Sequence, residues 1–307
     1  MSEYNSNFSL TEVITTAIQI PGVKVNRETF LREQFKKERP AKLERIIAYG
    51  PVEASCERKQ LQKMAKKLIN ERTALSTTAS FAAGLPGGLA MAATIPADII
   101  QFYGVALRMA QELAYLYGEG DLWNGATIDN ERVTNQLVLY CGVMLGVSGA
   151  TQAVRVLSSK LAQQALKKLP QKALTKTFYY PIVKSIAKFF GAKMTKDVFA
   201  KGVSKAVPII GGVVSGGMTF ATMRPMGVRL AEALDDAHFD YSQEEFEADW
   251  SDIVEENEKV EAEESKKSSV TNQQPMERLK QAKEMLEMGL ISEEEFAGLK
   301  AKILETI

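Results

Sequence analysis

The sequence predicts an all-α fold, a multi-helix bundle with glycine-rich apolar helical hairpins, plus a small helical hairpin at the C-terminal end. Apolar residues recur at spacings of three and four, most clearly over 102–117, whose apolar face carries Phe102, Val105, Met109, Leu113 and Leu116. Alternation of apolar and polar residues, the pattern of a half-buried strand, is scarce. The chain of 307 residues is long enough to bury a substantial core.

The helix predicted over 102–117 has sequence signals at both ends. Pro96 suits a first helical turn because it has no amide hydrogen to lose there, and Asp98 favours the positive end of the helix dipole. Gly118 opens the turn-rich stretch GEGDLWNG. We therefore expect the helix to end at Gly118.

Uncharged, glycine-rich runs are the most unusual feature of the chain. The run from Ala74 to Ala97 is long enough to cross a bilayer, but Gly84, Gly87 and Gly88 interrupt it together with Pro86. In lipid such a break would leave backbone groups without partners unless protein covered them. We expect two short helices joined by a tight turn inside a helical domain.

Two further uncharged runs cover 133–154 and 206–223, and each has two glycines four residues apart. This spacing places both glycines on one helix face, where a neighbouring backbone can approach closely. Tight packing in a soluble bundle and association in a membrane both use it. The helix-packing candidates are Gly84, Gly87, Gly88, Gly142, Gly146, Gly212 and Gly216.

A faint internal repeat links the first and third runs. Gly87-Gly88, Ala92 and Pro96 recur with the same spacing as Gly216-Gly217, Ala221 and Pro225. If the repeat is real, each half has a proline that opens an amphipathic helix, and two similar hairpins pack against each other. Composition alone could also produce these matches.

Charge is balanced overall, with 38 cations and 38 acids, but strongly segregated along the chain. Residues 155–205 hold twelve cations against one acid, and residues 232–264 hold fifteen acids against Lys259. This asymmetry predicts a basic interaction surface and an acidic, solvated tail. A nucleic-acid partner is not expected, because the chain is neutral and has no recognisable nucleic-acid-binding motif.

The basic region predicts two amphipathic helices, over 156–169 and 178–190. Helices of this kind lie in the headgroup layer of anionic lipid, with lysines near phosphate and aromatic rings in the acyl boundary. The alternative is a solvated lysine face over an ordinary core. The membrane-contact candidates are Lys160, Lys167, Lys168, Lys184, Lys188, Phe189 and Phe190.

Beyond Asp240 we expect a partly helical acidic segment, then a flexible linker, then a separate hairpin. In that hairpin Gly289 supplies a left-handed cap, and Ser292 with Glu295 forms a capping box that starts the second helix. So small a unit buries its apolar faces poorly, so it should bind another copy, another protein or its own domain. The partner-binding candidates are Leu279, Leu286, Ile291, Phe296 and Leu299.

Signals for catalysis are weak, and we expect no catalytic residue, metal or cofactor. His238 is the only histidine, and a solvated residue in a flexible acidic stretch explains it better than a metal ligand. The glycine-rich runs lack the pattern of a P-loop or of a dinucleotide-binding unit. Asp98 and Arg224 each lie near a proline at the edge of an apolar run. Pairing with the dipole at a helix start accounts for Asp98, and a charge at the boundary of the run accounts for Arg224.

The stretch GLPGGLAMAATIPADIIQFYGVALRMAQELAYLYG over 84–118 resembles the signature of the EcsC family of bacterial proteins, and PIIGGVVSGGMTFATM over 208–223 is similar to its second glycine-rich segment. The final MERLKQAKEMLEMGLISEEEFAGLKAKIL resembles the SHOCT domain, a short helical hairpin. These resemblances imply an N-terminal segment over 1–29, an EcsC-like helical domain over 30–238, an acidic linker over 239–274 and a SHOCT-like hairpin over 275–307. They imply a membrane-linked protein without established catalytic residues, whose hairpin serves oligomerisation or partner contacts.

The leading hypothesis is a non-enzymatic adaptor or regulator that associates peripherally with an anionic membrane surface. Because the N-terminus lacks an export signal and the only cysteines are Cys56 and Cys141, we expect a cytoplasmic protein on the inner face of the membrane. One alternative is an effector that inserts its glycine-rich runs and permeabilises the bilayer. A second is an enzyme that acts on a lipid or another membrane-borne substrate.

Overall fold

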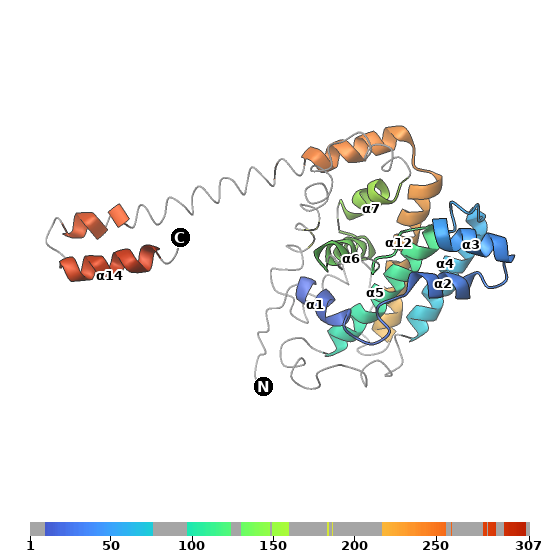
Figure 1. Cartoon of the computed structure of the whole chain (residues 1–307), viewed down its shortest axis with the longest axis horizontal. Helices are drawn as coiled ribbons and strands as arrows, with labels where there is room; N and C mark the ends of the chain where they lie inside the picture. Colours follow the sequence, from blue (N-terminus) through green and yellow to red (C-terminus); the bar gives the residue numbers. More distant parts are fainter. Residues whose placement is uncertain are drawn as a thin grey trace. The chain divides into compact units, whose positions relative to one another are not determined.

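The computed structural model describes residues 10–75, 97–123, 130–147, 149–159, 217–255 and 292–304, together with 183, 186, 259, 279–280 and 282–286. All regular secondary structure in these residues is helical, as the sequence predicts. The chain divides into two compact units, Met1–Ile253 and Val254–Ile307. Unit 1 contains α1 (Leu10–Ala17), α2 (Arg27–Gln34), α3 (Pro40–Tyr49), α4 (Arg58–Leu75), α5 (Ala97–Tyr117), α6 (Asn130–Met144), α7 (Ala150–Ser158) and α12 (Gly217–Phe239), and unit 2 contains α14 (Glu293–Leu304) (Figure 1).

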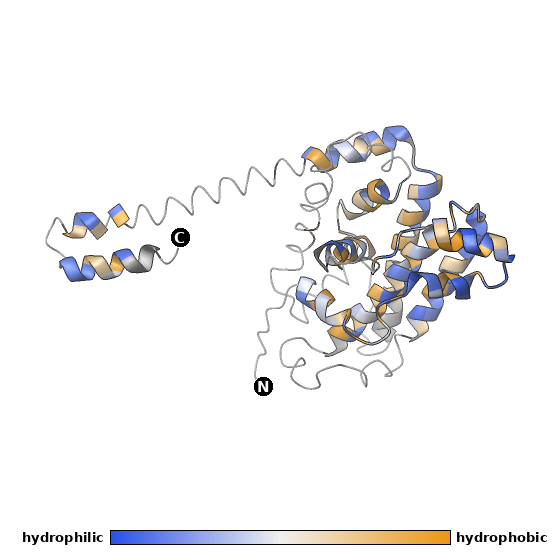
Figure 2. Cartoon of the chain, viewed as in Figure 1, coloured by the Kyte–Doolittle hydropathy of each residue, from blue (hydrophilic) through white to orange (hydrophobic). Residues whose placement is uncertain are grey.

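Helix α5 forms the centre of unit 1 and packs against α1, α4, α6 and α12. The predicted face, from Phe102 to Leu116, is buried, but so is almost every other residue from Ile99 to Tyr117. The expectation of a single apolar face was therefore too narrow, because neighbours cover this helix on all sides. Outer helices such as α2 and α3 instead carry many hydrophilic residues, drawn blue in Figure 2.

Helix α5 ends where the sequence predicts. Gly118 has a φ of +106°, its amide donates to the Tyr115 carbonyl at 3.2 Å, and the Glu119 amide donates to the Ala114 carbonyl at 3.0 Å. This pair of hydrogen bonds is the Schellman motif, which needs a left-handed residue after the last helical turn. A glycine adopts that conformation without a Cβ penalty.

The uncharged run over 133–154 is divided between α6 and α7, which corrects the prediction for its two glycines. Gly142 lies inside α6, where an added Cβ would come within 2.5 Å of Ile186 Cδ1. Gly146 lies beyond the end of α6 with a φ of +71°, and the amide that follows it donates to the Gly142 carbonyl at 2.9 Å. The two glycines therefore do not share a helix face, since Gly146 ends the helix.

Helix α7 also corrects the first predicted basic helix. The prediction begins a helix at residue 156 and continues it to 169, but α7 ends at Ser158. Ser159 has a ψ of 151°, and its hydroxyl donates to the Val156 carbonyl at 3.1 Å. Serine competes for backbone hydrogen bonds in this way, which favours a helix end over a helix interior.

Helices α4, α5 and α12 form a three-helix core whose ends are easily defined. At one end Arg58 and Gln62 of α4 bond Asp235 of α12, and farther along the Arg224 Nε donates to Asn70 Oδ1 at 3.2 Å. Helix α4 thus runs opposite to α12, and α5 has the direction of α12 (Figure 1). Leu75, Ala97 and Gly217 consequently lie at one end of the core, which we call the glycine-run end.

Helix α12 begins at Gly217, so Pro225 lies inside the helix rather than at its start. The prediction that this proline opens an amphipathic helix is therefore wrong for the second half of the proposed repeat. A proline there removes one backbone hydrogen bond to the carbonyl four residues earlier. Burial of Met223, Met226 and Leu230 against the rest of unit 1 offsets that loss. The other positions of the repeat fall largely outside the described residues.

The acidic segment after α12 folds onto unit 1, in contrast to the expectation of a solvated tail from residue 232. A helix over 243–255 is capped by Ser242 and Glu245, and it buries Phe246 and Ile253 in the core. Its partial helicity is as predicted. Of its acidic side chains, Asp249 is buried and pairs with Arg155 of α7, whereas Glu244, Glu245, Glu247 and Asp252 are exposed.

Unit 2 contains the second helix predicted for the C-terminal hairpin. The Glu295 amide donates to Ser292 Oγ at 3.3 Å, and the Ser292 amide donates to Glu295 Oε2 at 2.9 Å. These bonds confirm the predicted capping box. Ala282 is buried, whereas Met285 and Leu299 are 39% and 41% exposed. The predicted cap at Gly289 lies outside the described residues.

A candidate amphiphile-binding groove between α4 and α12

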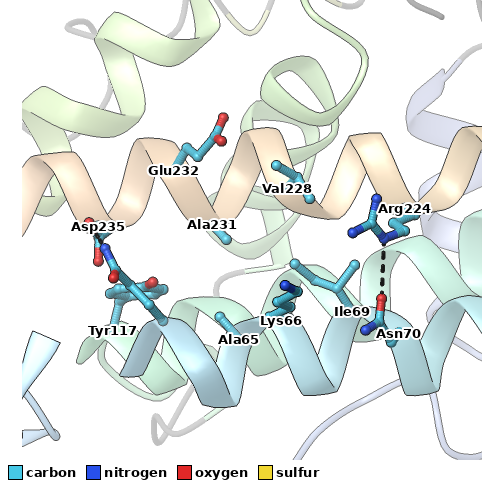
Figure 3. A pocket seen from close by; sticks show the side chains of 11 residues that line it. Ala65, Lys66, Ile69, Asn70, Tyr117, Arg224, Val228, Ala231, Glu232 and Asp235 are labelled. Carbon is cyan, nitrogen blue, oxygen red and sulfur yellow. Dashed lines mark hydrogen bonds between the residues drawn. The ribbon is translucent and has the colours of Figure 1, made fainter. Parts of the chain in front are cut away.

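A groove of about 330 Å³ lies between α4 and α12, near the lower limit for small-molecule sites (Figure 3). Helix α4 contributes one side and α12 the other, and the C-terminal end of α5 reaches in with Tyr117. The lining residues are Gln62, Ala65, Lys66, Ile69, Asn70, Tyr117, Arg224, Val228, Ala231, Glu232 and Asp235. From Gln62 to Asn70 the α4 side is about 12 Å long, at the rise of an α-helix.

The floor of the groove is apolar. Ala65 and Ile69 on α4 face Val228 and Ala231 on α12, in a view that shows these side chains between the two helices (Figure 3). Small residues at Ala65 and Ala231 leave space where longer side chains would fill the contact. The spacing of Val228 and Ala231, three residues apart, places both on the helix face toward α4.

Two cations line this floor, Arg224 at one end beside Asn70 and Lys66 midway along α4 (Figure 3). Lys66 and Arg224 are exposed, and Arg224 is held by its 3.2 Å hydrogen bond to Asn70. Within the described part of the chain, neither cation pairs with a carboxylate. The bond to Asn70 uses only Nε, so the two terminal nitrogens of the guanidinium remain able to donate to an anion. The structure therefore offers two positive groups beside an apolar floor.

The other end of the groove is closed by a network of ion pairs. Arg58 bonds Asp235 at 2.7 Å and also pairs with Asp240, while Gln62 Nε2 donates to Asp235 Oδ2 at 3.1 Å. The hydrogen bonds that Arg58 donates to Asp240 and Asp235 raise the pKa of Arg58, and the bond to Asp240 has the larger effect. Burial, together with the nearby Asp235 carboxylate, raises the pKa of Tyr117 above its usual range. The Asp235 charge is therefore compensated and the Tyr117 hydroxyl stays protonated.

A second hollow, of about 470 Å³, shares Gln62, Glu232 and Asp235 with this groove. Its lining mixes cations with acids, and Arg229 in it donates to the Met144 carbonyl at 3.1 Å. It lacks a continuous apolar floor. The groove between α4 and α12 is thus the better candidate for a ligand that has both an apolar and a charged part.

Only some of the candidate residues from the sequence lie in the part of the chain that the structure describes. The membrane-contact candidates Lys160, Lys167, Lys168, Lys184, Lys188, Phe189 and Phe190 lie outside the described residues, as do Gly84, Gly87, Gly88, Gly212, Gly216 and Ile291. Gly142 packs inside α6, and Gly146 caps it. In unit 2, Leu279, Leu286 and Phe296 are half-buried and Leu299 is exposed.

Arg224, Asp98 and His238 were also singled out in the sequence, and their positions are as follows. Arg224, which follows the uncharged run, is the eighth residue of α12 and lies on the rim of the groove. The side chain of Asp98 lies outside the described residues. His238 belongs to α12 rather than to a flexible stretch, and both its ring nitrogens are buried. In the described residues, no three histidine, cysteine or acidic side chains are grouped to hold a metal ion.

The groove was not predicted from the sequence. Only the lysines on its α4 side follow a pattern that the sequence shows. Lys59, Lys63, Lys66 and Lys67 repeat at spacings of three, four and seven, which places exposed lysines along one face of α4. That stripe can be read from the sequence. Its position beside Arg224 cannot, because the two lie more than 150 residues apart and meet only through the packing of α4 on α12.

Comparisons with known protein families, proteins and structures gave no match. No family model matches the chain. No curated protein matches it, and no solved structure does. Of the helices that the structure describes, none combines the length and the apolar character that crossing a membrane requires.

Proposed function

We propose that this protein is a non-enzymatic adaptor or regulator that binds an anionic membrane surface on the cytoplasmic side, and that its C-terminal hairpin binds a partner or a second copy. One observation carries the membrane part. The two uncharged runs before α5 and before α12 both connect to the glycine-run end of the three-helix core. The described helices that these runs join therefore begin or end at the same end of the core.

Charge near this end supports the same reading. Lys66, Lys67 and Arg224 are exposed between the middle of the core and this end, with Lys67 3.6 Å from Glu71, while Asp235, Asp236 and Asp240 lie toward the other end of α12. A cation near an anionic membrane contributes about 1 kcal/mol of binding free energy. These residues would hold the glycine-run end against lipid. The resemblance to the EcsC family, which this proposal adopts, has the same implication.

Vesicle flotation tests this proposal. The protein should float with vesicles that contain phosphatidylglycerol, stay at the bottom with phosphatidylcholine alone, and detach in high salt as the charges are screened. Combined reversal of Lys66, Lys67 and Arg224 to glutamate should weaken binding at least about tenfold, at about 1 kcal/mol for each charge. The matched control reverses Lys36, Lys37 and Lys59, which are exposed but distant from the glycine-run end.

Equal loss in the two triple variants would show that net charge, not this end, drives binding. Failure of the wild-type protein to float with anionic vesicles would overturn the membrane proposal. A dye-leakage assay on the same vesicles separates the adaptor from a permeabilising effector, since only an effector releases the dye.

The C-terminal hairpin is tested separately. We expect the exposed Leu299 and the half-buried Phe296 to contribute to the binding of a partner or a second copy, because unit 2 leaves part of its apolar surface uncovered. Light scattering on the wild-type chain and on Leu299→Lys measures the self-association component. A decrease in mass for the variant supports a copy as the partner, and a monomeric wild-type chain excludes it.

A further inference from the structure

We infer that the groove between α4 and α12 binds a single-chain anionic lipid, with its phosphate between Lys66 and Arg224 and its alkyl chain along Ala65, Ile69, Val228 and Ala231. This inference deepens the proposed function and rests on it in one respect, the membrane as the source of the lipid. It concerns a stoichiometric site within unit 1, whereas the proposed function concerns attachment to a surface.

The combination of two cations and an apolar floor in one groove identifies the chemistry. An entirely apolar ligand would leave Lys66 and Arg224 without an anion, and a free anion would leave the floor uncovered. A guanidinium presents paired donors to phosphate oxygens, and an ammonium adds a second positive charge that suits a phosphate monoester. An amphiphile satisfies both parts at once.

Arg224 is already oriented for this role. Its Nε bond to Asn70 fixes the plane of the guanidinium, and the residue is exposed beside the groove (Figure 3). Less rotamer freedom is then lost when an anion binds. Lys66 lines the same groove from the opposite helix, so a phosphate held by both cations would bridge α4 and α12.

The end of the groove near Asp235 determines the direction of the alkyl chain of the ligand. Asp235 and Glu232 would repel a phosphate placed there, and the Arg58 charge is already used by Asp235 and Asp240. Tyr117 contributes an aromatic ring to this end. The alkyl chain therefore points from Arg224 toward Tyr117, over a floor about 12 Å long.

Isothermal titration with water-soluble probes tests the inference on the full-length protein. Dodecyl phosphate, kept below its micelle concentration, should bind at one site per chain. Inorganic phosphate should bind at least about 100-fold more weakly, since it lacks the apolar contact, and dodecyltrimethylammonium at least about tenfold more weakly, since its charge has the wrong sign.

Variants locate the site. The double change Lys66→Gln with Arg224→Gln should weaken dodecyl phosphate binding at least about tenfold, and Lys59→Gln on the same helix should change it less than about twofold. Val228→Phe places a larger side chain over the floor and should weaken dodecyl phosphate and dodecyltrimethylammonium alike. Thermal melting of each variant verifies that it is folded.

Three results would overturn the inference: no binding of dodecyl phosphate, equal binding of the cationic probe, or unchanged affinity in the double variant. Its failure is separable from failure of the proposed function. Vesicle flotation without dodecyl phosphate binding eliminates only the groove, and dodecyl phosphate binding without flotation eliminates only attachment to the membrane surface.

Discussion

Two sets of cations in the core formed by α4, α5 and α12 differ in their partners. Near Asp235, which we call the carboxylate end, arginines and acids pair with one another, and Arg155 joins in by bonding Asp236 at 2.9 Å and Asp249 at 2.8 Å. Toward the glycine-run end, Lys66 and Arg224 lack such carboxylate partners among the described residues. Arg72, farther along α4, pairs with the buried Glu112 at 2.5 Å, so Lys66 and Arg224 are the cations of this part of the core that remain available for binding among those named here.

The helix dipole explains why the carboxylate end needs its arginines. Acids at Asp235 and Asp236 sit near the C-terminus of α12, where the dipole is negative and disfavours them. Arg58 from α4 and Arg155 from α7 compensate this arrangement and join those helices to α12. Arg155 also lies 5.1 Å from the centre of the Tyr241 ring. We therefore expect substitutions at the carboxylate end to lower the free energy of unfolding more than substitutions of Lys66 or Arg224.

The largest effect should come from the backbone contact at the carboxylate end. An added Cβ at Gly50, which has a φ of +89°, would lie 2.8 Å from Gly118 Cα. Gly50→Ala should therefore lower the free energy of unfolding by about 3 kcal/mol, through strain and overpacking together. Urea denaturation followed by circular dichroism measures this change. Gly120→Ala, with nothing within 4 Å of the added Cβ, is the control and should stay within about 0.5 kcal/mol.

The second largest effect should follow from removal of Arg155. Its side chain is 21% exposed, and Arg155→Leu would leave Asp249, 11% exposed, without its cation. A loss of about 2 kcal/mol in unfolding free energy is expected in the same denaturation experiment. Arg32→Leu removes an arginine that also bonds two carboxylates, but on the exposed surface, and should cost much less. Equal losses would show that burial does not distinguish the two networks.

A smaller effect should appear in the pH dependence of stability. The hydrogen bond from Arg58 lowers the pKa of Asp240 below its usual value of 3.8. Because the folded-state pKa is the lower one, the pair stabilises the folded protein fully above that value, and the stabilisation is lost as the pH falls through the lowered pKa. The difference in melting temperature between wild type and Asp240→Asn should therefore be larger at pH 6 than at pH 3. A constant difference would contradict the pairing.

The smallest effect is expected at the other end of the comparison. Lys66→Gln and Arg224→Gln should each change the unfolding free energy by no more than about 0.5 kcal/mol, because both side chains are exposed and neither compensates a buried acid. A loss as large as that of Arg155→Leu would show that these cations serve the fold. The contrast between ends would then disappear.

The sequence predicted single elements better than their combination. The end of α5 at Gly118 and the capping box of Ser292 and Glu295 were both predicted, because each depends on residues within one turn of helix. The interpretation of Gly142 and Gly146 as a shared face was wrong, since the same spacing also results when the second glycine ends the helix. Spacing alone does not distinguish these outcomes.

The candidate site was less predictable than the fold. Arg224 was noticed as an isolated charge, and the lysine stripe on α4 follows a helical period, but nothing local connects them. The acidic stretch after Glu232 read as solvated because its arginine partners, Arg58 and Arg155, lie about 80 to 180 residues away in the chain. Pairing of this kind reverses the usual inference from charge density.

By itself, the sequence determined the helical class, several helix ends and the uneven distribution of charge, since helical periodicity, capping and glycine conformation act over a few residues. Tertiary structure alone decided which charges are neutralised and which remain available. It also decided that α5 is buried on all sides and that a groove opens between α4 and α12. Those outcomes depend on the packing of distant segments, where burial and Coulomb interactions act between residues that the sequence does not place together.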